Sequence, residues 1–128
     1  PEIGALCQEK GVIFHTDAVQ AVGAVPIDVK AQNIDLLSLS AHKFHGPKGA
    51  GVLYARRGIP LTNLIEGGAQ ERGRRGGTEN VPAIMGMAAA LEEACADMEG
   101  RREKLLRLRD RLIDGLSRIP HAVLNGTG

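Results

Sequence analysis

The spacing of short apolar runs constrains the fold of this chain more than any other feature. Three such runs, each with the β-branched or apolar residues typical of strands, cover residues 12–16, 36–40 and 51–55. The connection over residues 18–35 is long enough for a parallel crossover, whereas the tight link over residues 45–49 favours an antiparallel partner. A short helix is predicted over residues 3–10, where Gly11 ends it. This order of elements predicts an α/β fold with a mostly parallel sheet and one antiparallel strand.

The last third of the chain is predicted to be helical. Asn80 is a suitable N-cap and Pro82 suits a first helical turn, so a long helix is predicted over residues 81–119. Apolar residues recur every three or four positions along it, and Pro120 ends the pattern. Gly100 either kinks this helix or divides it in two, and the sequence leaves both alternatives open.

The composition is that of an ordinary globular chain. The 128 residues contain 16 Lys and Arg against 15 Asp and Glu, and 43% are hydrophobic, which suffices for a core. A net charge of +1 argues against nucleic-acid or membrane-surface partners, which need clustered basic residues. The basic stretch over residues 101–118 is interpreted as a solvated helix face. No apolar run approaches the roughly 18 residues of a membrane span, so no membrane partner is predicted.

The two cysteines, Cys7 and Cys95, lie far apart in the sequence and show no paired spacing. Zinc sites and redox motifs need such spacing, so no metal site is predicted. Both cysteines are interpreted as packing residues, and a reducing cytoplasm is the expected location. The chain begins without an initiator Met and stops in an apparent turn, so we expect a piece of a longer protein.

Chemically active side chains follow the first two strand runs. If these strands are parallel neighbours, Asp17 and Lys43 face one crevice, at the carboxyl ends where ligands collect. A lone carboxylate and amine in such a crevice can also be a simple salt bridge. Ser40 and His42 add donors for a phosphate, Asp17 can hold a protonated ring nitrogen, and Gln20 can donate to a ring hydroxyl. These are the demands of pyridoxal phosphate, which needs a Schiff-base lysine, an acidic partner and phosphate donors.

Three segments carry a family resemblance that covers essentially the whole chain. They read HTDAVQAVGAVPIDV, DLLSLSAHKFHGPKGAGVLYARR and GGAQERGRRGGTENVPAIMGMAAAL. Together they closely resemble cysteine desulfurases of the NifS/IscS type, within the class V aminotransferase-like, fold-type I pyridoxal phosphate enzymes. The related SUF-type desulfurases and selenocysteine lyases usually have a different sequence after the lysine strand, and they remain the alternative.

The resemblance implies a domain organisation. Residues 1–80 would form the second half of the cofactor-binding large domain, and residues 81–119 the long connecting helix. Residues 120–128 would begin a C-terminal small domain. In the family, the nucleophilic cysteine and the arginine that binds the substrate carboxylate lie beyond Gly128, so this segment alone is expected to be inactive.

The resemblance also implies a role for each candidate site residue. Lys43 would bind the cofactor covalently and move the proton at the substrate α-carbon, as the catalytic residue. Asp17 would hold the ring nitrogen, and Gln20 would bind the ring oxygen. The phosphate would be held by Ser40, His42 and the backbone of Ala41.

Thr78 is expected to reach the cofactor phosphate of another subunit, which implies a homodimer. A rival role for Thr78 is to cap the helix that follows it. The implied reaction removes sulfur from L-cysteine and leaves alanine and an enzyme persulfide for iron–sulfur cluster assembly, so a sulfur-acceptor or scaffold protein is an expected partner. A non-enzyme alternative is an inactive dimerisation scaffold, but an idle site has no physical need for Asp17, Gln20, Ser40, His42 and Lys43 together.

Overall fold

The computed structural model describes residues 1–126 of the chain. It divides into two compact units, Pro1–Cys95 and Ala96–Gly128. The first unit contains the sheet and all candidate site residues, and the second contains a long helix.

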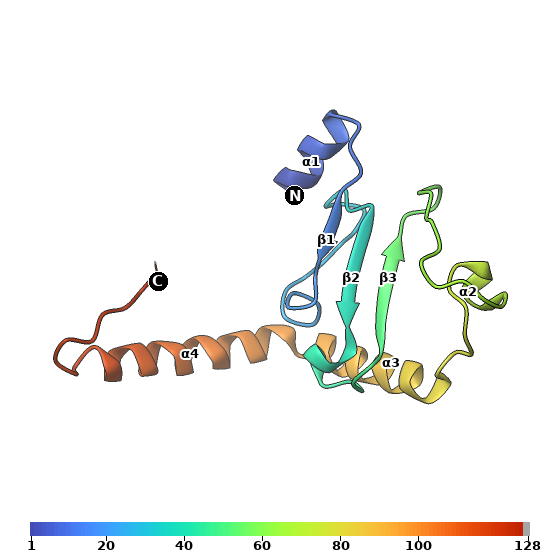
Figure 1. Cartoon of the computed structure of the whole chain (residues 1–128). Coiled ribbons are helices and arrows are strands. Elements are labelled where there is room, and N and C mark those ends of the chain that lie inside the picture. The colour runs from blue at the N-terminus through green and yellow to red at the C-terminus, as the bar shows by residue number, and fades with distance from the viewer. Residues whose placement is uncertain (127–128) are drawn as a thin grey trace. The chain divides into compact units, whose positions relative to one another are not determined.

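A three-stranded sheet forms the centre of the first unit (Figure 1). Helix α1 (Glu2–Glu9) precedes strand β1 (His15–Asp17), which pairs in parallel with β2 (Leu36–Ser40). Strand β3 (Gly51–Ala55) pairs antiparallel with the other side of β2. These pairings confirm the predicted parallel crossover and the antiparallel third strand. The observed bounds of β2 and β3 are those predicted.

Strand β1 is shorter than the sequence predicts, because residues 12–14 have no ladder partner. The Phe14 N–H donates to Oδ2 of Asp35 at 2.9 Å, and the Phe14 carbonyl accepts from Asp35 N and Leu36 N, both at 3.0 Å. The Asp35 side chain therefore takes the place of a strand partner at Phe14, and the paired part of β1 begins at His15. Arg56 completes this corner with an ion pair from Nε to Asp35 Oδ1 at 3.2 Å.

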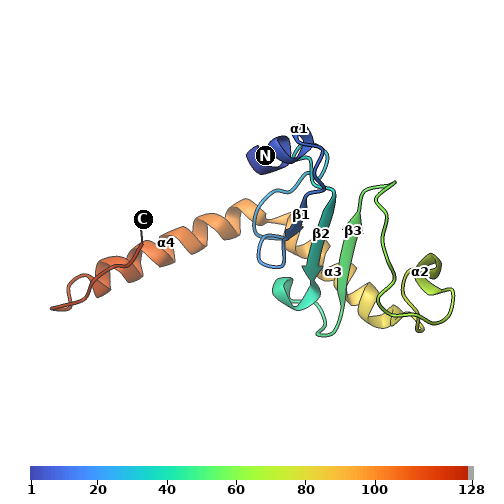
Figure 2. The same ribbon diagram turned by 45° about the horizontal axis from the view of Figure 1, so that its top comes forward.

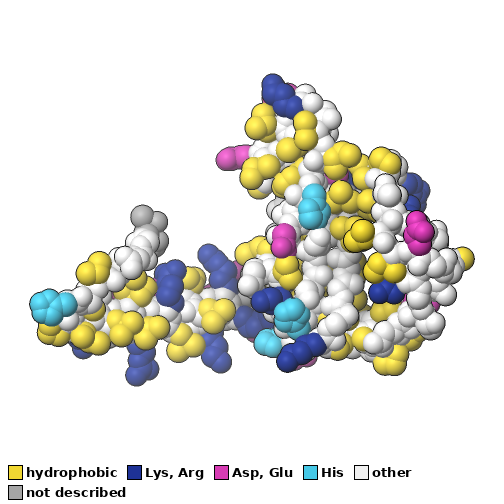
Figure 3. Space-filling model, in the orientation of Figure 1, with side chains coloured by type: hydrophobic (Ala, Val, Ile, Leu, Met, Phe, Trp, Pro, Cys, Tyr) yellow, Lys and Arg dark blue, Asp and Glu magenta, His cyan; other side chains and the backbone are white. Residues whose placement is uncertain are grey.

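The core lies on one face of the sheet. Alternation along the strands places Thr16, Leu37 and Tyr54 on this face, where they stand in register with one another. Leu37 packs there with Ala18 and Ile34 of the 18–35 connection. The opposite face carries the other polar residues of β1 and β2 together with Leu36 and the exposed Leu53. Figure 3 shows histidine and acidic side chains over β1 and β2 on its visible face.

Helix α3 (Val81–Ala96) packs across the carboxyl end of β2, behind the sheet in Figure 2. Its residues Met87 and Ala94 form a second buried cluster with Ala41 and Phe44, which follow β2. The Asn80 side chain accepts a hydrogen bond from the N–H of Ala83 at 3.2 Å, which confirms Asn80 as the N-cap.

The glycine-rich loop before α3 is more ordered than a simple connection. It contains the short helix α2 (Gln70–Gly73), in which Glu71 and Arg72 adopt left-handed φ angles of 48° and 59°. The loop closes on itself, because Gly76 N–H donates to the Ile65 carbonyl at 3.0 Å and Gly77 N–H donates to Gln70 Oε1 at 3.2 Å. This closure sets the position of the residues that lead into α3.

The predicted long helix is two helices, and the break lies at Asp97, not at Gly100. Asp97 has non-helical angles (φ −133°, ψ 49°) and is the N-cap of α4 (Met98–Leu116). Aspartate favours this position because its short polar side chain competes with the helical backbone. Gly100 lies within the first turn of α4, where a Cβ would collide with the Asp97 carboxylate. The helix also ends at Leu116, before the expected Ile119.

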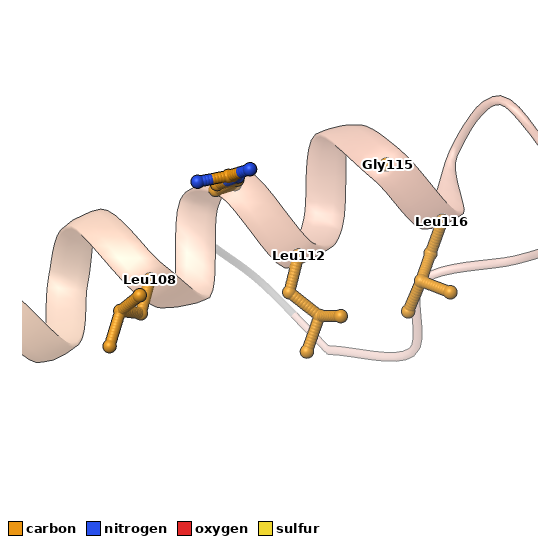
Figure 4. A pocket seen from close by; sticks show the side chains of 5 residues that line it. Leu108, Leu112, Gly115 and Leu116 are labelled. Carbon is orange, nitrogen blue, oxygen red and sulfur yellow. The ribbon is translucent and has the colours of Figure 1, made fainter.

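Helix α4 carries a leucine stripe on one side. Leu108, Leu112 and Leu116 project together and line a shallow groove with Arg111 and Gly115 (Figure 4). Leu112 is 61% exposed, so no part of the described second unit covers this stripe. Among the described residues, no helix is both long enough and apolar enough to cross a membrane.

Candidate functional site

The turn that carries Lys43 is held by its buried neighbours. It is a short 3-10 helix, η1 (Ala41–Phe44), in which Ala41 is fully buried and Phe44 nearly so. Ala41 N–H donates to the Ala50 carbonyl at 3.0 Å, and Gly46 N–H donates to the Ala41 carbonyl at 2.8 Å. The two anchored residues leave His42 and Lys43 exposed between them.

Gly46 is required at the close of this turn. A Cβ at this position would lie 2.9 Å from the Ala41 Cβ and 3.0 Å from the Ala41 carbonyl oxygen. His45, just before it, adopts a left-handed φ of 69° and ends η1. The lysine turn is therefore fixed by backbone geometry rather than by contacts of Lys43 itself.

Ser40 and His42 form a pair at the end of β2. Ser40 Oγ and His42 Nδ1 are 2.8 Å apart, and the two residues lie three and one positions before Lys43. When the hydroxyl donates to Nδ1, the proton of the neutral ring lies on Nε2, which can donate to a further group. The pair thus offers imidazole and hydroxyl groups for an anion, as the sequence predicted.

Asp17 ends β1 and begins the crossover. Its Oδ1 accepts a hydrogen bond from the N–H of Val19 at 3.0 Å, while Oδ2 has no partner among the described residues. The next turn is anchored on the buried Ala18, whose N–H continues the ladder to the Ser38 carbonyl at 2.9 Å. Gln20 is exposed on this turn and makes no hydrogen bond within the part of the chain that is described.

The topology brings these two polar segments to one edge of the sheet. Because β1 and β2 are parallel, Asp17 and Ser40 stand at carboxyl ends that face the same way. Asp17 and Lys43 form no ion pair, and Lys43 has no hydrogen-bond partner in residues 1–126. The simple salt bridge left open by the sequence is therefore not what the structure contains.

Two expected site residues differ from the others. The N–H of Ala41 is already paired with Ala50, so the expectation that this backbone group binds the phosphate gains no support. Thr78 is exposed and lines a hollow with the start of β3, Arg75 and the first turn of α3. Since Asn80 provides the cap of α3, the rival capping role of Thr78 is not observed.

The cysteines also differ from each other. Cys7 is half-buried in α1, which suits packing, whereas Cys95 is exposed on α3 within the described chain. Both thiols are free. The packing role expected for Cys95 is therefore not seen in this structure.

One pair on the open sheet face was missed by the sequence analysis. His15 Nε2 lies 2.8 Å from Ser38 Oγ, across the parallel ladder. The signal was present, because His15 stands two positions before Asp17 and Ser38 two before Ser40, so each shares a strand face with a site residue.

The donor set fits pyridoxal phosphate. An amine without a partner, a carboxylate with one oxygen available, and a hydroxyl–imidazole pair meet at one sheet edge. These groups match the cofactor's aldehyde, its ring nitrogen and its phosphate. The described residues near Lys43 offer no further set of phosphate donors, because the Ala41 N–H already donates to the Ala50 carbonyl.

Comparisons with known proteins agree with this geometry. The family model "Aminotransferase class-V" matches residues 1–128. The chain is 60% identical to a cysteine desulfurase IscS of Methanosarcina thermophila, over 98% of this chain and 31% of that protein. It is 59% identical to a cysteine desulfurase IscS of Clostridium botulinum, over 98% of this chain and 32% of the relative.

The fold comparison gives the same family. The structure of a NifS-like protein from Rickettsia africae superposes with a TM-score of 0.89 at 34% identity, over 93% of this chain and 33% of that chain. The chain thus spans about a third of the length of the curated relatives that it matches. A match over the whole chain, together with this shared fold, shows that the chain belongs to the class-V aminotransferase family, whose fold is that of the fold-type I pyridoxal phosphate enzymes.

Proposed function

We propose that this chain is the lysine-bearing part of a cysteine desulfurase that uses pyridoxal phosphate. The observation that carries the proposal is the sheet edge at which Lys43 and the Ser40–His42 pair follow β2 while Asp17 ends the parallel β1. The names of the relatives support the choice of substrate. The substrate is therefore L-cysteine, and the products are alanine and an enzyme persulfide.

Lys43 is the group that moves protons. When bound, pyridoxal phosphate supplies an electron sink that stabilises the negative charge left at the substrate α-carbon. The Lys43 amine takes the proton from that carbon and later returns one, so it must first give up its own proton. Its turn is anchored by Ala41 and Phe44 on both sides, which holds the Lys43 backbone in place while the side chain stays free to swing.

Asp17 and Gln20 bind the ring. The carboxylate of Asp17 is held on one side by the Val19 N–H, which leaves Oδ2 to receive a protonated ring nitrogen. A charged ring withdraws electrons more strongly than a neutral one, so this carboxylate makes the electron sink effective. Gln20, on the next turn, provides an amide donor for the ring oxygen.

Ser40 and His42 bind the phosphate from the end of β2. Their mutual hydrogen bond fixes the imidazole before the anion arrives, which reduces the entropy lost on binding. Thr78 would add a donor to the phosphate of a second subunit, and its exposure among Gly77 and Arg75 supports a role at a homodimer interface. This places the glycine-rich loop at that interface.

The proposal extends to the rest of the protein. The nucleophile and the arginine that binds the substrate carboxylate would lie outside these residues, with residues 120–128 leading into the small domain that holds them. The acceptor of the persulfide sulfur would be an iron–sulfur scaffold or carrier protein, and the location would be the cytoplasm, where the free thiols Cys7 and Cys95 stay reduced.

The test compares two lysine variants of the full-length protein. Lys43→Ala is expected to abolish alanine release from L-cysteine, because it removes the amine that would bind the cofactor and move the α-proton. Lys30→Ala, at an exposed turn of the crossover, is the matched control and should retain full activity. Retained turnover in Lys43→Ala would refute the proposal.

The same assay separates the alternatives. Faster turnover of L-selenocysteine than of L-cysteine would identify a selenocysteine lyase with the same cofactor site. Failure of the full-length wild-type protein to bind pyridoxal phosphate would instead favour the inactive scaffold.

A further inference from the structure

The His15–Ser38 pair occupies the polar face of the sheet. Its 2.8 Å contact joins β1 to β2 on the side opposite Leu37 and Tyr54, which belong to the core. A buried core histidine would be explained by packing, but His15 is exposed in the described chain and contributes nothing to either buried cluster. The pair therefore needs another explanation.

Both members of the pair are neighbours of Asp17. His15 precedes Asp17 by two residues on β1, so their side chains leave the same face of the strand. Ser38 is the register partner of Asp17 on β2, and neighbouring strands lie about 4.8 Å apart. The three side chains thus form one patch at the edge where the proposed cofactor ring binds.

The chemistry of a serine hydroxyl links the three groups. A hydroxyl can accept one hydrogen bond while it donates another. With its proton on Nε2, His15 donates to Ser38 Oγ, and the Ser38 proton is then available to the neighbouring Asp17 carboxylate. A hydrogen bond to an ionised carboxylate is stronger than one between neutral groups, so this arrangement holds the Asp17 carboxylate in a fixed orientation.

We propose that His15 and Ser38 are positioning residues that act through Asp17. His15 fixes the Ser38 hydroxyl, and the hydroxyl supports the carboxylate that holds the cofactor's ring nitrogen. The inference rests on the proposed function, in which Asp17 has that role. It assigns to β1 and β2 a hydrogen-bonded support whose members lie two residues before Asp17 and Ser40 on their strands.

The test measures binding of two ligands to the full-length protein freed of cofactor. One ligand is pyridoxal phosphate, and the other is its 1-deaza analogue, in which a C–H group replaces the ring nitrogen. His15→Ala and Ser38→Ala should each weaken binding of pyridoxal phosphate by about tenfold, the usual effect of losing a hydrogen bond to a charged group. Neither variant should change binding of the analogue, because the analogue makes no charged contact with Asp17.

Two further substitutions at His15 sharpen the test. The amide nitrogen of glutamine replaces Nε2, which makes the observed contact, whereas that of asparagine replaces Nδ1. His15→Gln should therefore keep the wild-type preference for pyridoxal phosphate, and His15→Asn should lose it. Thr16→Val, on the same strand but on the core face, is the control for general loosening of β1 and should bind both ligands normally.

The controls separate this inference from the proposed function. Asp17→Asn must lose the preference for pyridoxal phosphate over the analogue; if it does not, the role of Asp17 in the proposed function fails. If Asp17→Asn behaves as expected but the His15 and Ser38 variants match the wild type, only the positioning role is overturned. Equal weakening of both ligands would also overturn it, because that result indicates a purely structural contact.

Discussion

Replacing Asp35 with alanine should loosen the start of β1 without unfolding the sheet. The Asp35 carboxylate is only 17% exposed and accepts the Phe14 N–H at 2.9 Å as well as the Arg56 ion pair at 3.2 Å. Loss of the acceptor leaves a part-buried N–H unpaired, at a cost of about 1 to 3 kcal/mol. The ion pair adds at most about 1 kcal/mol, because Arg56 is 39% exposed and solvent screens it.

The two contributions sum to about 1 to 4 kcal/mol in the free energy of local opening, and the middle of this range, about 2 to 3 kcal/mol, is the expected change. Hydrogen exchange of the full-length protein, followed by mass spectrometry, measures this quantity directly. Peptides that contain Phe14 should exchange about 30 to 150 times faster in Asp35→Ala, while peptides from α4 should not change. Asp28→Ala is the matched control, since Asp28 also accepts backbone N–H groups, but only within its own exposed turn.

A second variant decides which contact matters. Asp35→Asn keeps an oxygen for the Phe14 N–H and loses only the charge, so its effect should stay below about 1 kcal/mol. If asparagine costs as much as alanine, the ion pair and not the backbone contact dominates, and the reasoning is refuted. Unchanged exchange at Phe14 in the alanine variant would refute it as well.

Three further predictions concern other regions. The backbone N–H of Ala31 and a second N–H of the same turn hold the pKa of Asp28 below its ordinary 3.8. These hydrogen bonds therefore stabilise the fold above pH 3.8, and their stabilisation is lost as the pH falls through the folded-state pKa. Carbon NMR titration of the carboxyl checks the direction of the shift, and Asp28→Asn should remove this pH-dependent loss of stability. Gly46→Ala should weaken binding of pyridoxal phosphate and destabilise the protein by about 1 to 3 kcal/mol, because the fully buried Ala41 cannot move away from the new Cβ. Cofactor titration and thermal unfolding measure the two effects, and an unchanged cofactor affinity would contradict the claim that the turn is fixed. The isolated 128-residue chain should bind the cofactor weakly and self-associate through the leucine stripe of α4. Leu112→Glu should therefore reduce the mass measured by sedimentation, and an equal mass for the variant and the unchanged chain would argue against association through this stripe.

The sequence predicts a helix or strand best where the residues that set its ends are its neighbours in the chain. The run over β2 lies between the polar Asp35 and the anchored Ala41, and its bounds were confirmed. Strand β1 was predicted too long because its start depends on the Asp35 side chain, 21 positions away from Phe14. The helix break was expected at Gly100 from helix propensity, whereas the backbone leaves the helical region at Asp97, whose side chain makes no capping hydrogen bond.

The candidate site follows the same rule. The Ser40–His42 contact was predictable because both residues lie two positions apart beside Lys43. For His15 and Ser38 the sequence shows only that each shares a strand face with a site residue; their contact depends on the register between two strands that the crossover separates. The hydrogen bond from the Ala41 N–H was also not predictable, since its acceptor is the carbonyl of Ala50, on the other side of the β2–β3 hairpin.

The two closures of the lysine turn bear on how this region folds. Both link residues within ten positions of one another, so little chain entropy is lost when they form. Pairing of β1 with β2 requires closure of the whole crossover and is slower for that reason. The hairpin that presents Lys43 can therefore form early in folding, and Asp17 joins it later. Assembly of the cofactor site is complete only when the parallel strand docks.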